Sequence, residues 1–255
     1  MRTALVRRPA RDLAQGLVTH VERRPVELEL ARAQWAGYVA ALESAGWKAL
    51  EVEPAEGCPD SVFVEDTLVV YRGLAVATRP GAPSRLAEVE GAEAASRSLG
   101  LPIARIEAPA TLDGGDVLAV GETVYVGTGG RTNAGGVSQL RALLEPRGAI
   151  VLEVPVAGFL HLKSAVTALP DGTVVGYPPL APDPDQFDDF LAVPEESGAH
   201  VVVLGPRAVL LAADCPRSAE LYASLGYDPV VVEIGEFQKL EGCVTCLSVL
   251  TDAGS

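Results

Sequence analysis

Hydrophobic positions along the chain follow two alternating periods that recur in a fixed order. Four Ala-rich segments with helical spacing each end in glycine and lead directly into a short apolar run of strand length. The pairs are 33–46 with 47–53, 84–100 with 101–107, 133–148 with 149–154, and 216–226 with 227–233. Glycine just past a helix end adopts the left-handed conformation without a steric penalty, and Asn133 suits an N-cap. The pattern therefore predicts four helix–strand pairs.

Two short apolar runs precede each of these helices except the first. Turn residues such as Arg72-Gly73 and Gly121-Glu122 separate the runs, which indicates antiparallel hairpins. The paired runs are 67–71 with 74–78, 117–120 with 123–127, 165–169 with 174–177, and 201–204 with 208–212. In the third pair the helix that should follow is degraded, because residues 183–189 are short and interrupted by proline. The repeating unit is strand–strand–helix–strand, about 40 to 50 residues long.

Two incomplete units remain at the ends of the sequence. The run 247–251 has no helix after it, and the strand 4–6 with the helix from Ala33 lacks a partner strand. Joining the two halves gives a fifth unit and removes the exposed sheet edges that promote aggregation. We therefore predict an α/β fold, specifically a closed five-bladed α/β propeller with pseudo-fivefold symmetry. A single catalytic domain would span residues 1–255, a length that such a domain allows.

Composition restricts the class of protein further. Hydrophobic residues make up 48% of the chain and aromatic residues only 5%, so the core should consist mainly of Val, Leu and Ala. A net charge of −14 argues against nucleic acid and anionic membranes as partners and is compatible with a cationic ligand. The N-terminal segment lacks the apolar region of a signal peptide, and no apolar run reaches the ~18 residues of a membrane span. We expect a cytoplasmic protein with reduced cysteines.

The connectors between units carry polar residues of different chemistry at equivalent positions. These are the segment 60–66, Asp113, His161 and Cys246. In a propeller, equivalent connectors gather at one end of the symmetry axis, so these residues should meet in one site. A cysteine, a histidine and several carboxylates would supply a nucleophile, a proton donor and acceptor, and partners for a cation.

Some of these residues also allow other interpretations. Cys243 and Cys246 form a Cys-x-x-Cys pattern, which occurs in thioredoxin-like redox proteins and in half of a zinc site. Neither a thioredoxin-like βαβ pattern nor a second pair of ligands accompanies them, so we interpret Cys243 as a small apolar neighbour of the nucleophile. Cys58 and Cys215 are interpreted as ordinary core or loop thiols, and Asp116 as a structural residue.

Five motifs lie in order along the chain. They are Pro-Asp-Ser-Val-Phe-Val-Glu-Asp at 59–66, Thr-Leu-Asp-Gly-Gly-Asp-Val-Leu at 111–118, Arg-Thr-Asn at 131–133, His-Leu-Lys at 161–163, and Glu-Gly-Cys-Val-Thr-Cys-Leu-Ser at 241–248. Together they resemble dimethylarginine dimethylaminohydrolases, which belong to the guanidine-modifying superfamily that includes arginine deiminase. The resemblance runs from about Leu5 to Leu250 without a large insertion. It implies a five-bladed α/β propeller and an enzyme that uses neither a metal nor a cofactor.

The same resemblance implies a complete set of site residues. Cys246 would be the nucleophile and His161 the general acid and base. The implied substrate-binding residues are Asp66 and Asp113 with Glu65 for the guanidinium group, Arg85 and Arg131 for the α-carboxylate, and Asp60 with the backbone carbonyls of Leu17 and Leu240 for the α-amino group. Residues 16–25 resemble the lid of the family.

The implied reaction is hydrolysis of Nω-methylated arginines to citrulline and dimethylamine or methylamine through a covalent thiouronium on cysteine. The alternatives are another guanidine-modifying enzyme, such as an arginine deiminase or an amidinotransferase, and a non-catalytic propeller that binds zinc or senses thiols. The chain is too short for the helical insertion of the similar deiminases. The expected partner is a small cationic substrate, and the expected assembly is a monomer or a homodimer.

Overall fold

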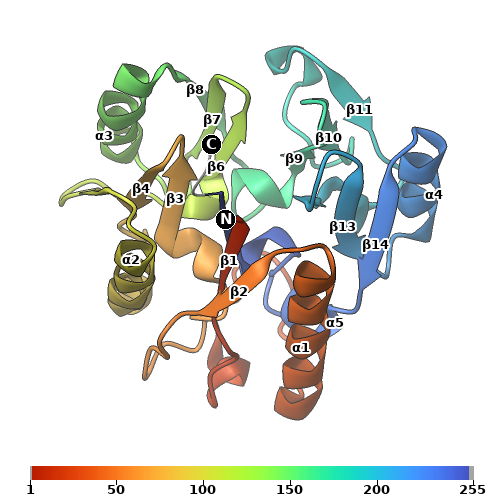
Figure 1. Cartoon of the computed structure of the whole chain (residues 1–255), viewed down its shortest axis with the longest axis horizontal. Helices are drawn as coiled ribbons and strands as arrows, with labels where there is room; N and C mark the ends of the chain where they lie inside the picture. The colour runs from red at the N-terminus through yellow and green to blue at the C-terminus, as the bar shows by residue number, and fades with distance from the viewer. Residues whose placement is uncertain (1, 253–255) are drawn as a thin grey trace.

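Five three-stranded sheets make up the β structure of the computed structural model, which describes residues 2–252 (Figure 1). The strands are β1 (Arg2–Val6), β2 (Lys48–Glu51), β3 (Leu68–Tyr71), β4 (Leu74–Ala77), β5 (Ile103–Arg105), β6 (Val117–Val120), β7 (Thr123–Thr128), β8 (Ile150–Pro155), β9 (Val166–Ala168), β10 (Val174–Gly176), β11 (Phe190–Ala192), β12 (Val202–Val203), β13 (Ala208–Ala212), β14 (Asp228–Val232) and β15 (Val249–Asp252). The sheets are β3-β4-β5, β6-β7-β8, β9-β10-β11, β12-β13-β14 and β15-β1-β2. The domain predicted for residues 1–255 extends at both ends beyond the described residues.

All five sheets have the same connectivity. The middle strand pairs antiparallel with the first strand and parallel with the third. In four sheets a helix connects the middle strand to the third, as parallel pairing requires. The helices are α1 (Leu28–Ser44), α2 (Val89–Ser98), α3 (Ala134–Leu144) and α4 (Pro216–Ser224). In the sheet β9-β10-β11 only the 3-10 turn Pro184–Gln186 replaces the helix. The strand–strand–helix–strand unit and its one degraded helix are confirmed.

The sheet β15-β1-β2 joins the two ends of the described chain. Arg2 lies opposite Asp252 and Leu5 lies opposite Val249 in the antiparallel pair, while β2 pairs parallel with the other edge of β1. In Figure 1 β1 lies near the middle of the view and α1 to α4 lie on the outside. The predicted union of the two half-units is confirmed.

The ends of the helical segments follow the sequence signals. Asn133 caps α3, because its side-chain oxygen accepts a hydrogen bond from the backbone N–H of Gly136 at 2.9 Å. Each of the four terminal glycines has a positive φ: 83° at Gly46, 76° at Gly100, 79° at Gly148 and 91° at Gly226. The glycine signals therefore mark the helix ends correctly.

The structure differs from the predicted helices at three places. α1 begins at Leu28 rather than at residue 33, and the backbone N–H of its N-cap residue Glu27 donates to Glu236 Oε2 at 2.8 Å, which anchors the start of the helix. The segment 84–100 consists of a 3-10 turn, Pro83–Glu88, followed by α2. A short helix, α5 (Gly235–Gln238), also precedes the Cys-x-x-Cys segment and was not predicted.

A 3-10 turn leads into the first strand of each sheet. The turns are Val64–Thr67 before β3, Gly114–Asp116 before β6, Leu162–Ser164 before β9, Glu196–Ala199 before β12 and Thr245–Leu247 before β15. Four of them carry or directly follow a residue predicted for the active site. The first turn contacts both the second and the fifth, and the second contacts the third. The connectors therefore bring the predicted residues together, as the repeat implies.

Apolar side chains fill the space between the sheets and the helices that connect their strands. Four of the five buried clusters consist mainly of Val, Leu, Ala and Ile, as the low aromatic content predicts. The largest cluster lies under α1 and adds Trp35, Tyr38, Phe63 and Phe237. None of the helices within residues 2–252 combines the length and the apolar character needed to cross a membrane.

Candidate active site

Cys246 lies in the 3-10 turn that precedes β15 and is only 7% exposed. Its sulfur accepts a hydrogen bond from the backbone N–H of Cys243 at 3.4 Å, and the two Sγ atoms are 3.3 Å apart. Gly242 lets the loop pack closely against Phe63, because a Cβ there would lie 2.3 Å from the ring of Phe63. The local sequence therefore holds the thiol of Cys246 at the inner end of a closely packed loop.

Glu65 lies beside this loop as a buried carboxylate. It accepts a hydrogen bond from Lys163 Nζ at 2.6 Å and another from the Thr245 hydroxyl at 3.0 Å. Burial raises the pKa of Glu65 to about 7, although the charge of Lys163 acts in the opposite direction. Glu65 is thus linked to the nucleophile loop through Thr245.

Asp66 has a different electrostatic environment. Its carboxylate accepts hydrogen bonds from the Arg85 guanidinium and, at 2.9 Å, from the backbone N–H of Gly115. Burial alone would raise the pKa of Asp66, but the charges of His161 and Arg85 outweigh it and lower the pKa to about 2. Asp66 is therefore ionised at neutral pH.

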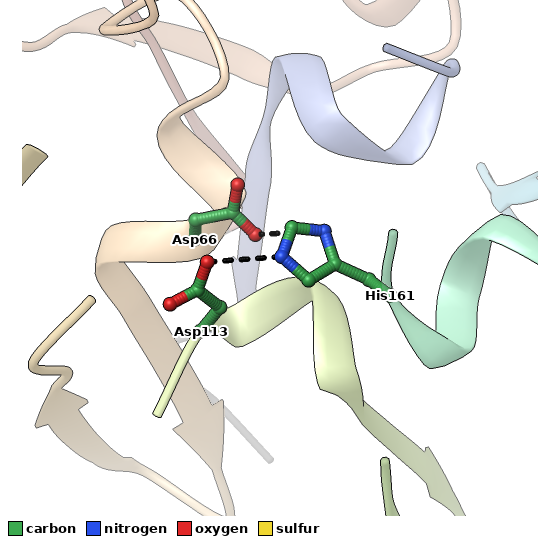
Figure 2. A group of neighbouring side chains, drawn as sticks. All are labelled: Asp66, Asp113 and His161. Carbon is green, nitrogen blue, oxygen red and sulfur yellow. Dashed lines mark hydrogen bonds and ion pairs between the residues drawn. The ribbon is translucent and has the colours of Figure 1, made fainter. Parts of the chain in front are cut away.

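His161 lies between two aspartates (Figure 2). Its Nε2 is 2.9 Å from Asp113 Oδ2, and its Nδ1 is 3.7 Å from Asp66 Oδ1. Gly115 allows this approach, because a Cβ there would lie 2.6 Å from Asp66 Oδ1 and 2.7 Å from His161 Nδ1. Burial would lower the pKa of His161, but Asp66 and the hydrogen bond to Asp113 raise it to about 9. The imidazole is therefore a cation that can donate a proton.

These three side chains also have the spacing of a metal site. Asp66, Asp113 and His161 each offer one ligand atom, and these atoms lie within 4.8 Å of one another. Charge pairing alone also explains why these atoms lie close together, because a protonated imidazole and the two carboxylates beside it stabilise one another. The absence of a metal from the mechanism stays a prediction, which activity in the presence of a chelator would test.

The charge state of His161 can be measured directly. We expect the imidazole of the ligand-free protein to titrate with a pKa of about 9. In Asp66→Asn the strongest stabilising charge is lost, so the pKa should fall by about one pH unit or more. An NMR titration of ¹⁵N-labelled histidine measures both values, and the signal missing from His161→Gly identifies the residue. An unchanged midpoint in Asp66→Asn would contradict the assigned cause.

The two predicted arginines differ in their availability. Arg85 is buried and donates to Asp66, to Glu88 at 2.7 Å and to two backbone carbonyls. Its guanidinium therefore also has a structural function. Arg131 is the more accessible, since its side chain is 15% exposed and its Nη1 lies 3.7 Å from Asp113 Oδ2. Binding of a substrate carboxylate by either residue stays a prediction.

Two carboxylates hold the lid segment (residues 16–25) against the site. Asp60 accepts a hydrogen bond from the backbone N–H of Leu17 at 2.9 Å. Glu241 accepts hydrogen bonds from the hydroxyl of Thr19 at 3.0 Å and from the backbone N–H groups of Thr19 and His20. Glu241 itself has a positive φ of 63°, which is uncommon for a residue with a side chain. These hydrogen bonds tie Leu17, Thr19 and His20 to the loops that carry Asp60 and Glu241, while the function of residues 16–25 as a lid stays a prediction.

A cavity of about 20 Å³ lies beneath the lid segment. Eight of the ten predicted site residues line it: Leu17, Asp60, Asp66, Arg85, Arg131, His161, Leu240 and Cys246. Glu65 and Asp113 do not line it, but Glu65 accepts a hydrogen bond from Thr245, the neighbour of Cys246, and Asp113 lies 2.9 Å from His161. The structure therefore brings the whole predicted set together.

A relative from Streptomyces coelicolor decides the family. This N(G),N(G)-dimethylarginine dimethylaminohydrolase is 63% identical over 246 residues, which cover 96% of this chain and 95% of that protein. The chain belongs to the dimethylarginine dimethylaminohydrolase family. A comparison with models of protein families gave no match.

Solved structures of dimethylarginine dimethylaminohydrolases have the same fold. The Pseudomonas aeruginosa enzyme, as a cysteine-to-serine variant in complex with citrulline, superposes with a TM-score of 0.90 at 33% identity and covers 98% of both chains. A histidine-to-glycine variant, as an adduct with S-methyl-L-thiocitrulline, gives a TM-score of 0.91 at 32% identity and covers 98% of this chain and all of that one. The predicted resemblance to dimethylarginine dimethylaminohydrolases is confirmed.

Sequence reasoning did not single out several residues of this site. Phe63, Leu160 and Glu241 line the cavity, while Lys163 and Thr245 bind Glu65. Four of the five lie inside the motifs shared with dimethylarginine dimethylaminohydrolases, and Leu160 immediately precedes one. The signal was therefore present, but the contacts that give these residues a function appear only in three dimensions.

Asp116 has the structural function predicted for it. One of its oxygens accepts a hydrogen bond from the backbone N–H of Leu162 at 3.0 Å, and the other accepts one from the Thr132 hydroxyl at 2.7 Å. Leu162 directly follows His161, and Thr132 directly follows Arg131. Asp116 thus holds two segments of the site in fixed relation.

Proposed function

We propose that the protein hydrolyses Nω-methylated arginines, namely asymmetric dimethylarginine and monomethylarginine, to citrulline and dimethylamine or methylamine. The observation that carries the proposal is that Cys246, His161 and Asp66 line one cavity in a chain of the dimethylarginine dimethylaminohydrolase family. These side chains provide a nucleophile, a proton donor and a partner for the guanidinium group.

The cationic substrate helps to activate the thiol. The hydrogen bond with Cys243 and burial raise the pKa of Cys246, and the charges of Glu65 and Asp66 add to the effect. A guanidinium group bound between the thiol and these carboxylates offsets their charge and favours the thiolate. The nucleophile therefore forms where and when its substrate is present.

The thiolate then attacks the guanidinium carbon to give a tetrahedral adduct. His161 donates its proton to the dimethylamine nitrogen, the C–N bond breaks, and an S-alkylthiouronium remains on Cys246. The neutral imidazole next accepts a proton from water as the water oxygen attacks the same carbon. Cleavage of the C–S bond, with loss of the remaining hydroxyl proton to solvent, releases citrulline and restores the thiolate. Asp66 and Asp113 stabilise the imidazolium in each half-reaction, because both face its ring.

The amino-acid end of the substrate binds on the side of the lid segment. Arg131 and Arg85 hold the α-carboxylate, with Arg131 as the more available anchor. Asp60 and the backbone carbonyls of Leu17 and Leu240 receive the α-amino group. In this structure Asp60 accepts a hydrogen bond from the backbone N–H of Leu17. The α-amino group of the substrate takes the place of this N–H as the hydrogen-bond donor to Asp60.

Substrate entry requires the lid segment to move. A cavity of about 20 Å³ has room for about one water molecule, far less than an amino acid needs. Movement of the lid segment breaks the hydrogen bonds to Asp60 and Glu241, and closure over the substrate excludes water from the reacting groups.

The same proposal includes the finer fold, a closed five-bladed α/β propeller formed as a single domain. Its support is the repeated connectivity of five sheets and the sheet β15-β1-β2, which contains both ends of the described chain. Closure places the five 3-10 turns around one axis.

Selectivity between methylated and free arginine tests the proposed function. A dimethylated nitrogen has no N–H, and the apolar side chains of Phe63 and Leu160 line the cavity together with His161. Free arginine would place an unpaired NH₂ there, at a cost of about 1–3 kcal/mol. We therefore expect kcat/KM for arginine to be at least about tenfold below that for either methylarginine.

The measurement is colorimetric citrulline formation from the three compounds in one buffer. Comparable values for the two methylarginines with a lower value for arginine support the proposal. If arginine is hydrolysed equally well or better, the deiminase alternative replaces it.

A further inference from the structure

The active site contains a second thiol that the reaction does not use. Cys243 and Cys246 are both reduced and buried, and their Sγ atoms are 3.3 Å apart across the start of the turn Thr245–Leu247. A disulfide requires a distance of about 2.05 Å, so a small movement of the two side chains suffices to bring the sulfurs to bonding distance.

The two thiols face different cavities. Cys246 lines the 20 Å³ cavity of the active site, whereas Cys243 lines an adjoining cavity of about 700 Å³, and Leu160, Glu241 and Gly242 line both. Residues of the lid segment, including His20, and the more distant Phe159 and His200 form other parts of the wall of the larger cavity. A small solute can therefore reach Cys243 without passing through the smaller cavity.

The surroundings of Cys243 also favour its reactive form. The hydrogen bond from Cys246 lowers the pKa of Cys243, although burial opposes this effect. The nearby charge of His200 and the Thr245 hydroxyl, which lies 3.2 Å from Cys243 Sγ, act in the same direction as the hydrogen bond. Thiolates, not thiols, react with peroxides.

We propose that Cys243 and Cys246 form a reversible disulfide that switches the enzyme off when a small hydroperoxide enters the larger cavity. The Cys243 thiolate attacks the peroxide O–O bond, which gives a sulfenic acid on Cys243 and releases the alcohol or water. Cys246 then attacks this sulfur, the S–O bond breaks, and the hydroxide leaves as water with the proton of the Cys246 thiol as the S–S bond forms. Two thiols are oxidised and one peroxide is reduced.

The consequence for activity rests on the proposed function of Cys246 as the nucleophile, but the formation of the disulfide does not. A disulfide leaves no thiolate to attack the guanidinium carbon. Reduction by a dithiol restores both thiols and, with them, turnover. The remaining cysteines supply controls, because within residues 2–252 Cys58 and Cys215 hydrogen-bond to the backbone carbonyls of Ser84 and Ala212 and not to another cysteine.

The test treats the intact protein with one equivalent of hydrogen peroxide and follows both mass and activity. The peptide that contains both cysteines should lose two hydrogens, and two of the four thiols should become unreactive toward a thiol reagent. Activity should fall in proportion to the disulfide and return with dithiothreitol. Cys58→Ser and Cys215→Ser should respond as the wild type does.

The variant Cys243→Ser separates this proposal from simple oxidation of the nucleophile. Without Cys243 no disulfide can form, so peroxide should act more slowly, and the loss should progress to a sulfinic acid on Cys246 that dithiothreitol does not reverse. The proposal is overturned if the wild-type peptide gains oxygen instead of losing two hydrogens, or if Cys243→Ser shows the same reversible loss. The mass of the peptide tests formation of the disulfide whether or not the protein acts on methylarginines.

Discussion

Replacing Cys246 with serine is expected to reduce citrulline formation by roughly 10³-fold or more, because it removes the nucleophile. A serine hydroxyl is far less acidic than a thiol, and Glu65 and Asp66 oppose any negative charge at this position. Serine has nearly the same shape as cysteine, so the buried position should keep its packing and the fold should stay intact. Thermal denaturation would check this. The measurement is kcat with asymmetric dimethylarginine as substrate.

Cys243→Ser is the matched control for this substitution. It makes the same sulfur-to-oxygen change at another position of the same loop and leaves the nucleophile in place, so most of the turnover should remain. Equal losses in the two variants would favour a dithiol or metal-binding function for the Cys-x-x-Cys pattern. A metal chelator should leave the wild-type rate unchanged.

The second large effect is expected from His161→Gly, which should uncouple formation of the covalent adduct from its hydrolysis. S-methyl-L-thiocitrulline loses methanethiolate, a leaving group that needs no proton, so Cys246 should still become alkylated. Dimethylamine leaves only after protonation, so dimethylarginine should give neither adduct nor citrulline. Mass spectrometry of the intact protein distinguishes these outcomes.

His20→Gly serves as the control for this variant. His20 is exposed, and the hydrogen bond that it gives to Glu241 comes from its backbone, which glycine retains. It should turn over both substrates at close to the wild-type rate. A wild-type rate in His161→Gly would exclude His161 from the mechanism.

Much of the fold follows from the sequence because its signals are local. Glycines at helix ends, the cap at Asn133 and the hairpin turns each act within a few residues. Signals of the same kind recur in successive units, so each unit supports the assignment of the others. The start of α1 was wrong because it depends on a contact between Glu27 and Glu236, which are distant in the sequence. No local pattern encodes such an anchor.

Which residues form the site was also predictable, because the repeat places them at equivalent positions. Equivalent connectors carry the predicted residues, and the 3-10 turns that contain them do contact one another. The pairing of side chains was not predictable. Arg85 donates to Glu88 as well as to Asp66, and Lys163 binds Glu65, because buried charges must find partners within the packed interior.

The sheet that joins the two ends has a consequence for folding. β1 pairs with β15 at the largest sequence separation of any strand pair among the described residues, and such nonlocal pairing slows folding. By loop-closure entropy it costs about 1.5 kcal/mol more to form than a contact across roughly 45 residues. The other four sheets pair within short spans, and Cys246 directly precedes β15. Circular dichroism would therefore detect most of the native structure in a chain whose end strands are still unpaired, whereas citrulline formation reports only molecules in which folding is complete.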